Sequence, residues 1–351
     1  MDGLKKSKKA AVFIAAAVLV IAMASANALA AIPLRLAGNT AADTAVEISK
    51  QTGWSGTAIL ASSETYGMSE TLAAGPLAYY LKAPILLTEN RTLLNGASKA
   101  ELTRLRVSKV YVTSGTAAIP QSVLDEITAM GITVITLGGQ NRAETSVNIA
   151  KLMPGVTKVA VANSVPDALS IASVAAAANQ PILLVDKDHV SEAVTNYLAD
   201  TGILSADIIG GTGIISEAVA NKFPNAQRHY GYTAYDTNDR VIQTFVSQLS
   251  FDIIYVANGV TAIDALSGTP LAAITKSPFI LTDGRTVPSA TAFVFGQHGG
   301  NSRVTALGGT AVISASNYQG MEQGINTGIG QSETGGDSDA EDEELRVTDI
   351  N

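Results

Sequence analysis

Pro84-Ile85-Leu86-Leu87-Thr88 is a short apolar stretch that occurs three times in the chain. It returns as Pro181-Ile182-Leu183-Leu184-Val185 and as Pro278-Phe279-Ile280-Leu281-Thr282, so the three prolines stand 97 residues apart. A leucine upstream of each stretch keeps the same spacing (Leu72, Leu169 and Leu266), and we read the three surrounding segments as aligning without gaps. Self-similarity at a fixed period indicates a repeat architecture.

Two further landmarks recur with nearly the same period. A glycine turn follows each apolar stretch, and its glycines Gly115, Gly211 and Gly309 are 96 and 98 residues apart. A Gly-to-Thr segment with a spacing of six residues opens each repeat, and an acidic residue precedes its Thr (Gly38 to Thr44, Gly139 to Thr145, Gly231 to Thr237). The landmarks predict one unit of about 95 residues made three times, which is longer than a solenoid repeat, so we expect each unit to form a domain.

The period sets the expected domain boundaries. We place the first module at 31–131, the second at 132–228 and the third at 229–316. Residues 317–351 form a tail that is first rich in glycine and then acidic. We expect a flexible linker followed by a segment that has little apolar surface to bury.

The first 30 residues have the three regions of a secretory signal peptide. Four lysines come first, an apolar run extends from Ala10 to Ala24, and an Ala-x-Ala pattern ends at Ala30. The run is shorter than the roughly 20 residues that a membrane-spanning helix needs, so an uncleaved anchor is the less favoured alternative. We therefore expect an exported protein that begins at Ala31 and has no stable membrane span after cleavage.

Composition excludes several classes of protein. The 351 residues carry a net charge of -8, which argues against a nucleic-acid partner because such a binder needs a basic face. The chain has no cysteine, so disulfides, cysteine–zinc sites, iron–sulfur clusters and thiol catalysis are excluded. Its three histidines are far apart in the sequence, and we expect no metal site and no cofactor.

Short apolar strands alternate with helical segments in the first module. The expected strands are Thr57–Ala61, Ile85–Leu87, Lys109–Thr113 and Ile132–Leu137, and the expected helices are Glu70–Leu81, Lys99–Leu105 and Gln121–Met130. We read Ser98 and Glu101 as a capping box and Pro120 as part of a first helical turn. This alternation predicts parallel strands joined by crossover helices, and hence an α/β fold of three tandem small domains with mostly parallel sheets.

These motifs resemble the cell wall-binding repeat type 2 family. The resemblance rests on the strings Arg35–Ile48, Ala61–Ala78 and Ala83–Thr88, on Pro166–Ser170 and Ile263–Gly268, and on the Gly-Gly-Thr turns at Gly210 and Gly308. It covers about 31–316. It implies Rossmann-like or toprim-like modules packed around a pseudo-threefold axis, and a protein held non-covalently on a Gram-positive cell wall by an anionic polysaccharide or a teichoic-acid-like polymer.

The chain also departs from the family pattern. The opening motif of the family has Arg-Tyr before the acid, whereas this chain has Ala41-Ala42, Arg142-Ala143 and Ala234-Tyr235. The Asp-Ala-Leu of the later repeats is replaced by Glu70-Thr71-Leu72 in the first. We infer that the modules have diverged in ligand binding and that the first is the weakest.

Basic residues in equivalent loops are the first candidate ligand-binding groups. Arg91 and Arg285 each lie three residues beyond the Thr that ends the apolar stretch, and Lys187 is close to the same place in the second repeat. Ligand sites of parallel α/β sheets lie at the carboxyl ends of the strands, where such bases could pair with phosphate or carboxylate. The simpler alternative is a solvated loop charge, which is common on protein surfaces.

The glycine turns are the second candidates: Gly115-Thr116, Gly211-Thr212 and Gly309-Thr310. Backbone N–H groups in these turns could receive an anion. The favoured alternative is structural, because glycine permits the turn and threonine caps the next helix.

A non-catalytic wall-binding protein is the function that these patterns favour. The acids Asp43, Glu144 and Asp236 fit helix starts without any chemistry, and no aromatic motif is common to the three repeats, so we expect polar or charge-based recognition. We expect no separate effector domain once the three repeats are subtracted. The alternatives are a secreted wall hydrolase or modifying enzyme, such as an amidase-associated protein, and a secreted scaffold with an acidic tail.

Overall fold

Three parallel four-stranded sheets form the frame of the computed structural model, which describes residues 32–64, 72–89 and 91–328. The first sheet has the order β3-β2-β4-β5, from Ile85–Thr88, Thr57–Ser62, Lys109–Val112 and Thr133–Thr136. The second has the order β7-β6-β8-β9, from Ile182–Leu184, Lys158–Ala162, Ser205–Ile209 and Ala226–His229. The third has the order β11-β10-β12-β1, from Phe279–Thr282, Ile253–Asn258, Arg303–Leu307 and Arg35–Leu36. The α/β fold with three parallel modules is confirmed.

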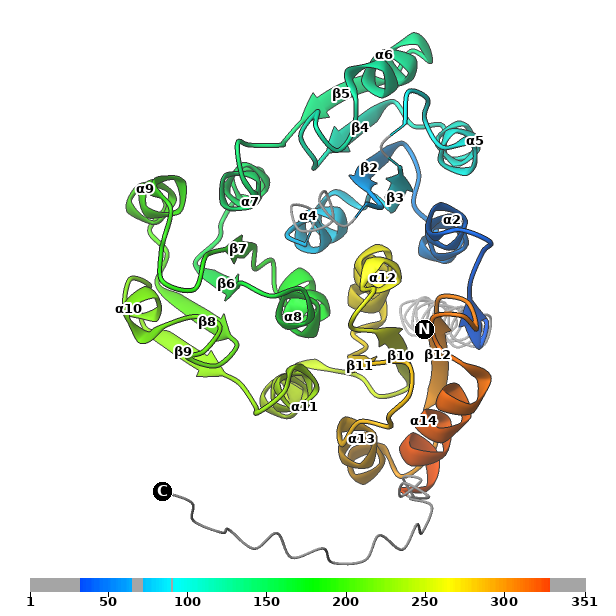
Figure 1. The fold of residues 1–351 in the computed structure, drawn as a ribbon, viewed down its shortest axis with the longest axis vertical. Coiled ribbons are helices and arrows are strands. Elements are labelled where there is room, and N and C mark those ends of the chain that lie inside the picture. The colour runs from blue at the N-terminus through cyan, green and yellow to red at the C-terminus, as the bar shows by residue number, and fades with distance from the viewer. Residues whose placement is uncertain (1–31, 65–71, 90, 329–351) are drawn as a thin grey trace, which may run out of the picture.

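The sheets are offset from the sequence repeats by one strand. The strand β1, which opens the first repeat, pairs with β12 of the third sheet through Arg35↔Ala306 and Leu36↔Leu307. In the same way β5 joins the first sheet, although the period groups it with the second repeat. The first and third sheets therefore take their fourth strand from the start of a repeat, whereas β9 lies at the boundary expected between the second and third repeats. The strand β1, the first among the described residues, closes the ring (Figure 1). The repeat boundaries stay a prediction.

Helices cover both faces of each sheet. The first repeat contributes α2 (Ala41–Thr52), α4 (Ala74–Leu81), α5 (Gly96–Arg104) and α6 (Gln121–Ala129). The second contributes α7 (Arg142–Ala150), α8 (Val165–Ala177), α9 (Glu192–Asp200) and α10 (Glu217–Ala220). The third contributes α11 (Ala234–Thr244), α12 (Ile263–Thr275), α13 (Ala290–His298) and α14 (Ala315–Thr327), with a short 3-10 turn at Val246–Gln248. The helix α14 covers the first part of the tail expected at 317–351 and buries Met321 and Ile325, so the expectation of a flexible linker is wrong for residues 317–327.

The equivalent helices α4, α8 and α12 meet at the centre of the molecule, and each contacts the other two (Figure 1). Their apolar faces and the inner faces of all three sheets form one continuous core. Each sheet also has a separate core on its outer face. Along β2, Ile59 and Ala61 therefore belong to the shared core, and Ala58 and Leu60 to an outer one, as the two-residue period of a strand requires.

The Gly-to-Thr segments are hydrogen-bonded loops that start a helix in each repeat. The N–H groups of Gly38, Gly139 and Gly231 donate to the Oγ1 atoms of Thr44, Thr145 and Thr237 at 3.0, 2.8 and 3.0 Å. The caps of the three helices are Thr40, Asn141 and Thr233. The acids Asp43, Glu144 and Asp236 lie in the first turns, so their expected place at helix starts is confirmed.

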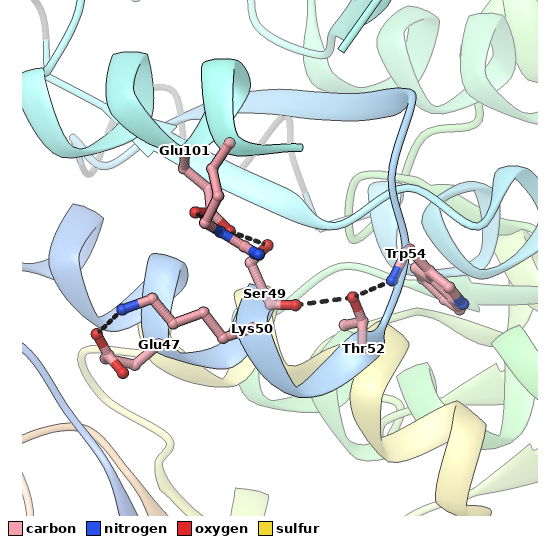
Figure 2. Close-up of polar contacts among 7 residues, drawn as sticks. Glu47, Ser49, Lys50, Thr52, Trp54 and Glu101 are labelled. Atoms are coloured by element: carbon pink, nitrogen blue, oxygen red, sulfur yellow. Dashed lines mark hydrogen bonds and ion pairs between the residues drawn. The ribbon is translucent and has the colours of Figure 1, made fainter. Parts of the chain in front are cut away.

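The expected capping box at Ser98 and Glu101 is wrong. The helix α5 begins earlier, with Asn95 as its cap, and Ser98 Oγ donates to the Leu87 carbonyl at 2.6 Å. Glu101 instead accepts a 2.7 Å hydrogen bond from Ser49 Oγ, which joins α5 to α2 (Figure 2). A buried carboxylate needs such partners, and Arg104 supplies the balancing charge at 2.7 Å.

Three smaller expectations also change. Pro120 is the cap of α6 rather than a residue of its first turn. The paired residues Ile59↔Ile85, Ala160↔Ile182 and Tyr255↔Phe279 are 26, 22 and 24 residues apart, so the repeats do not align without gaps. The difference lies between the strand and the central helix, where loops tolerate changes in length. The start of the helix expected at Glu70–Leu81 lies outside the described residues, and α4 runs over Ala74–Leu81.

Lys82, Asn179 and Lys276 lie at equivalent positions of the three repeats and share one backbone conformation. All three residues are left-handed, with φ of 51°, 52° and 53°, just after the central helices. A left-handed residue is a common way to end a helix. What the repeats retain here is a backbone conformation and not a charge.

Candidate functional site

The predicted basic residues lie on three different sheets. Arg91, Lys187 and Arg285 follow the edge strands β3, β7 and β11, and all three are exposed. None of them forms an ion pair with a carboxylate in the part of the chain that the structure describes. Arg91 lines a hollow of about 560 Å³ together with Leu93 and Asn95. Their role in binding stays a prediction.

Two of these loops also contain an acid that is held by its own neighbours. Glu89 accepts two hydrogen bonds from Asn95 Nδ2 at 3.0 Å. Asp283 accepts from the N–H groups of Arg285 and Thr286 at 2.8 and 2.7 Å. Burial raises the pKa of Asp283, but these hydrogen bonds outweigh burial and hold the pKa below its usual value. The acids thus fix the loops and leave the basic side chains in solvent.

The second repeat has an additional arginine at the carboxyl ends of its strands. Arg142 donates to the Asn163 carbonyl at 2.6 Å, to the Val185 carbonyl at 2.8 Å and to Asp186 at 2.8 Å. It thereby ties the loop after β6 to the loop after β7. The equivalent positions in the other repeats are Ala41 and Ala234, so this tie exists in one module only.

The Gly-Thr turns follow the third strand of each module. Thr116, Thr212 and Thr310 are all exposed. The carbonyls of Gly115, Gly211 and Gly309 each accept from the backbone N–H groups three and four residues later. The caps of the next helices are Pro120, Ser216 and Ser314, so the expectation that the threonines cap these helices is wrong, because one more turn intervenes.

The second and third turns leave backbone donors free. In the described structure the N–H groups of Gly211, Thr212 and Gly213 donate to no acceptor, and the same holds for Gly309 and its two successors. Successive free N–H groups can receive an anion. The role of the Gly-Thr pairs as an anion site stays a prediction.

Buried acids lie beneath the same two turns. Asp167 and Asp264 begin α8 and α12, and burial raises the pKa of each to about 6. A Cβ on Gly210 would stand 2.8 Å from Asp167 Oδ2, and one on Gly308 would stand 2.4 Å from Asp264 Oδ2. The glycines, with φ of 117° and 104°, therefore make room for the carboxyl groups.

Two arginines close these turns from the fourth strands. Arg228 donates to the Gly210 carbonyl at 2.8 Å, and Arg35 donates to the Gly308 carbonyl at 2.7 Å. In the first module Ser114 takes the place of the glycine. The sequence shows this difference as Gly-Gly in the second and third repeats and Ser-Gly in the first.

A hollow of about 540 Å³ connects the second turn to the opening loop of the third repeat. It is lined by Asp167, Gly211, Thr212 and Ile214 on one side and by Tyr230 and Tyr232 on the other. A second hollow of about 720 Å³ is lined by the same two tyrosines and by residues of α11. Sequence analysis missed this place because the tyrosines occur in only one repeat.

The described residues contain no cluster of three or more acids and histidines that could hold a metal ion. None of the helices in this part of the chain combines the length and apolar character that crossing a bilayer demands. The signal peptide expected at 1–30 and the acidic end of the tail lie outside the described residues.

The three repeats match a known family model, and parts of the chain match two known proteins. The model of the family described as cell wall binding domain 2 (CWB2) matches residues 35–124, 136–220 and 228–318. The N-acetylmuramoyl-L-alanine amidase LytC of Bacillus subtilis is 32% identical over 283 residues, which are 80% of this chain and 56% of that protein. The amidase enhancer of the same organism is 30% identical over 226 residues, which are 63% of this chain and 30% of that protein.

Two solved structures from Clostridium difficile have the same fold. Cwp6 is 29% identical with a TM-score of 0.74, and the match covers 83% of this chain and 47% of that one. Cwp8 is 26% identical with a TM-score of 0.74, and the match covers 83% of this chain and 51% of that one. The chain thus spans about half the length of these proteins or less.

Proposed function

Since the chain belongs to the cell wall binding domain 2 family, we propose that it is an exported, non-catalytic protein that attaches to the cell wall by binding an anionic wall polymer. The observation that carries this proposal is the threefold match of the family model across residues 35–318. The relatives share these repeats over part of their length. The proposed location of the protein is therefore the outer surface of the cell.

The anionic character of the polymer is supported by groups at the carboxyl edges of the sheets. Arg91, Lys187 and Arg285 are exposed and free of ion pairs among the described residues, and free N–H groups lie in two of the Gly-Thr turns. A chain with a net charge of -8 must bind a polyanion through such local donors, since its overall field repels the ligand.

A second candidate function follows from the names of the relatives. One is an amidase and another an amidase enhancer, so a secreted wall hydrolase, or a protein that acts on one, is the alternative. A single experiment separates the two. The protein is mixed with purified cell walls and centrifuged, and both the pelleted protein and the wall fragments released into solution are measured. Pelleting without release supports attachment, and release of fragments supports the enzyme.

The same assay tests the basic residues. Reversing all three charges (Arg91→Glu, Lys187→Glu, Arg285→Glu) should weaken pelleting, and the weakening should shrink as salt is added. The matched control reverses three other exposed lysines, Lys109, Lys151 and Lys222, none of which follows the carboxyl end of a strand. Equal binding by the two triple variants would count against a specific role for the three loops.

A further inference from the structure

Two exposed tyrosines stand where the second module meets the third. The Tyr232 side chain is as exposed as it would be in an extended peptide, at 106%, and Tyr230 is 55% exposed. The Tyr230 ring lies against the second Gly-Thr turn, since a Cβ on Gly211 would be 3.5 Å from Tyr230 Cδ2. This contact holds one ring in place while its outer face stays open.

The pair lies where hollows of about 540 and 720 Å³ meet, because both tyrosines line both hollows. Ile214, which is 40% exposed, extends the apolar surface on the side of the turn. Exposed apolar side chains that lie together form a patch of the kind that marks an interaction site. Tyrosine suits such a place because its ring is large and loses little conformational freedom on binding.

A single free positive charge faces the larger hollow. Arg240 of α11 is exposed and makes no side-chain hydrogen bond or ion pair with any described residue. The acids beside it are already occupied. Asp236 Oδ2 accepts from Thr233 at 3.0 and 2.8 Å, and Asp239 accepts from Gln243 and Ser289 at 3.0 and 2.9 Å. Arg240 is therefore the group that remains available to an anion.

We propose that Tyr230 and Tyr232 form a stacking subsite for a pyranose ring of an anionic wall glycan, and that Arg240 pairs with the acidic group of that glycan. This rests on the proposed function of wall attachment. A sugar ring has an apolar face of C–H groups that can lie on a tyrosine ring, and polar groups at its rim that turn to the loop. The guanidinium adds a contact to phosphate or carboxylate.

The other repeats supply the design of the test. Because the three opening loops share the same Gly-to-Thr hydrogen bond, Tyr230 corresponds to Ala37 and Gly138, and Tyr232 to Asn39 and Gln140. A variant with Tyr230→Ala and Tyr232→Asn therefore has the residues that the same fold already accommodates in the first repeat. The control is Gln140→Ala, which alters the equivalent exposed position of the second repeat.

The experiment measures pelleting with purified cell walls over a range of protein concentrations, at low and at high salt. The wild-type protein and Gln140→Ala should bind alike. The double tyrosine variant should bind about tenfold more weakly at both salt concentrations, and Arg240→Gln several-fold more weakly at low salt only. Circular dichroism and a thermal melt verify that each variant is folded.

The outcomes separate the two proposals. If the wild-type protein does not pellet with walls, wall attachment itself fails. If it pellets and the folded tyrosine variant binds with equal affinity, the stacking subsite is refuted while wall attachment stands. If the tyrosine variant is weakened but Arg240→Gln binds as the wild type does at low salt, the sugar stacks without an acidic group and the charged half of the proposal is wrong.

Discussion

Gly75→Ala tests whether the three modules share one core or fold separately. Gly75 lies in the central helix α4, and an added Cβ would come within 2.3 Å of Thr269 Cγ2 in α12 of the third module. Thr269 cannot turn away freely, because its hydroxyl donates to the Ala265 carbonyl at 3.2 Å. The two helices must therefore move apart or the threonine must change rotamer and lose that bond.

The size of the effect follows from two opposing terms. Overpacking a buried contact costs about 1–3 kcal/mol. Replacing glycine by alanine inside a helix returns about 1 kcal/mol of helix propensity. We therefore expect Gly75→Ala to lower the free energy of unfolding by up to about 2 kcal/mol. In the exposed first turn of α5, Gly96→Ala meets no atom within 4 Å and should leave stability unchanged or raise it.

Urea unfolding followed by circular dichroism measures these changes. Combining Gly75→Ala with Thr269→Ser removes the clashing methyl group, so the double variant should recover about 1 kcal/mol relative to the sum of the single changes. Additive effects would mean that the two helices do not touch, and the shared core would then be wrong. A separate transition for each module would refute it independently.

Two other changes probe the carboxyl edges, and a third probes the buried Asp207 in the middle of β8. Burial raises the pKa of Asp167 to about 6, so the folded state binds the proton more tightly than the unfolded chain does. The free energy of unfolding should therefore fall by roughly 3 kcal/mol as the pH rises from about 4 through 6. Asp167→Asn should remove this fall, which urea titrations at a series of pH values measure. Gly210→Ala should cost at least about 2 kcal/mol, because its φ is 117° and its Cβ would meet the Asp167 carboxyl group, whereas Gly213→Ala has open space and should be neutral in the same thermal melts. Asp207→Ala should cost about 2–3 kcal/mol at pH 7, because it leaves His229 and Lys158 without their buried partner, and a wild-type melt at pH 3 should show part of this loss.

The repeated apolar stretches were sufficient to predict the three parallel sheets. Buried parallel strands are continuous apolar runs, and Ile85–Thr88 and its two equivalents are that kind of run. The exchange of the fourth strand could not be predicted, because β1 consists of Arg35 and Leu36 alone. Two residues carry no periodicity, and their pairing with β12 depends on closing a ring of more than 260 residues (35 to 306).

Local helix starts were predictable where a single hydrogen-bond pattern decides them. The Gly-to-Thr spacing translates directly into a capped helix in each repeat. The start of α5 was not predictable, because Ser98 and Glu101 form hydrogen bonds with Leu87 and Ser49 and not a capping box. Tertiary contacts override a local capping pattern when the side chains are buried.

The candidate site was predicted only as far as its residues repeat. A search for equivalent positions finds Arg91, Lys187 and Arg285, and it passes over Tyr230 and Tyr232, which occur in one repeat only. Arg142 was noted only in the comparison with the family motif and not as a site residue. The proximity of Asp167 to Gly210 was also hidden, because the two residues are 43 positions apart and meet only when the sheet has formed. Repetition identifies the scaffold, and departures from repetition identify the places where the modules differ.

That difference has a consequence for how a wall polymer would be held. The first module has Ser114 in place of the turn glycine and Ala41 in place of Arg142, and the tyrosine pair stands only between the second and third modules. Three equal sites on one rigid body would bind a repeating polymer by avidity, and the loss of any one would reduce binding by a similar factor. Unequal sites distribute the free energy of binding unevenly, so substitutions near Tyr230 and Arg142 should weaken binding far more than the corresponding substitutions in the first module.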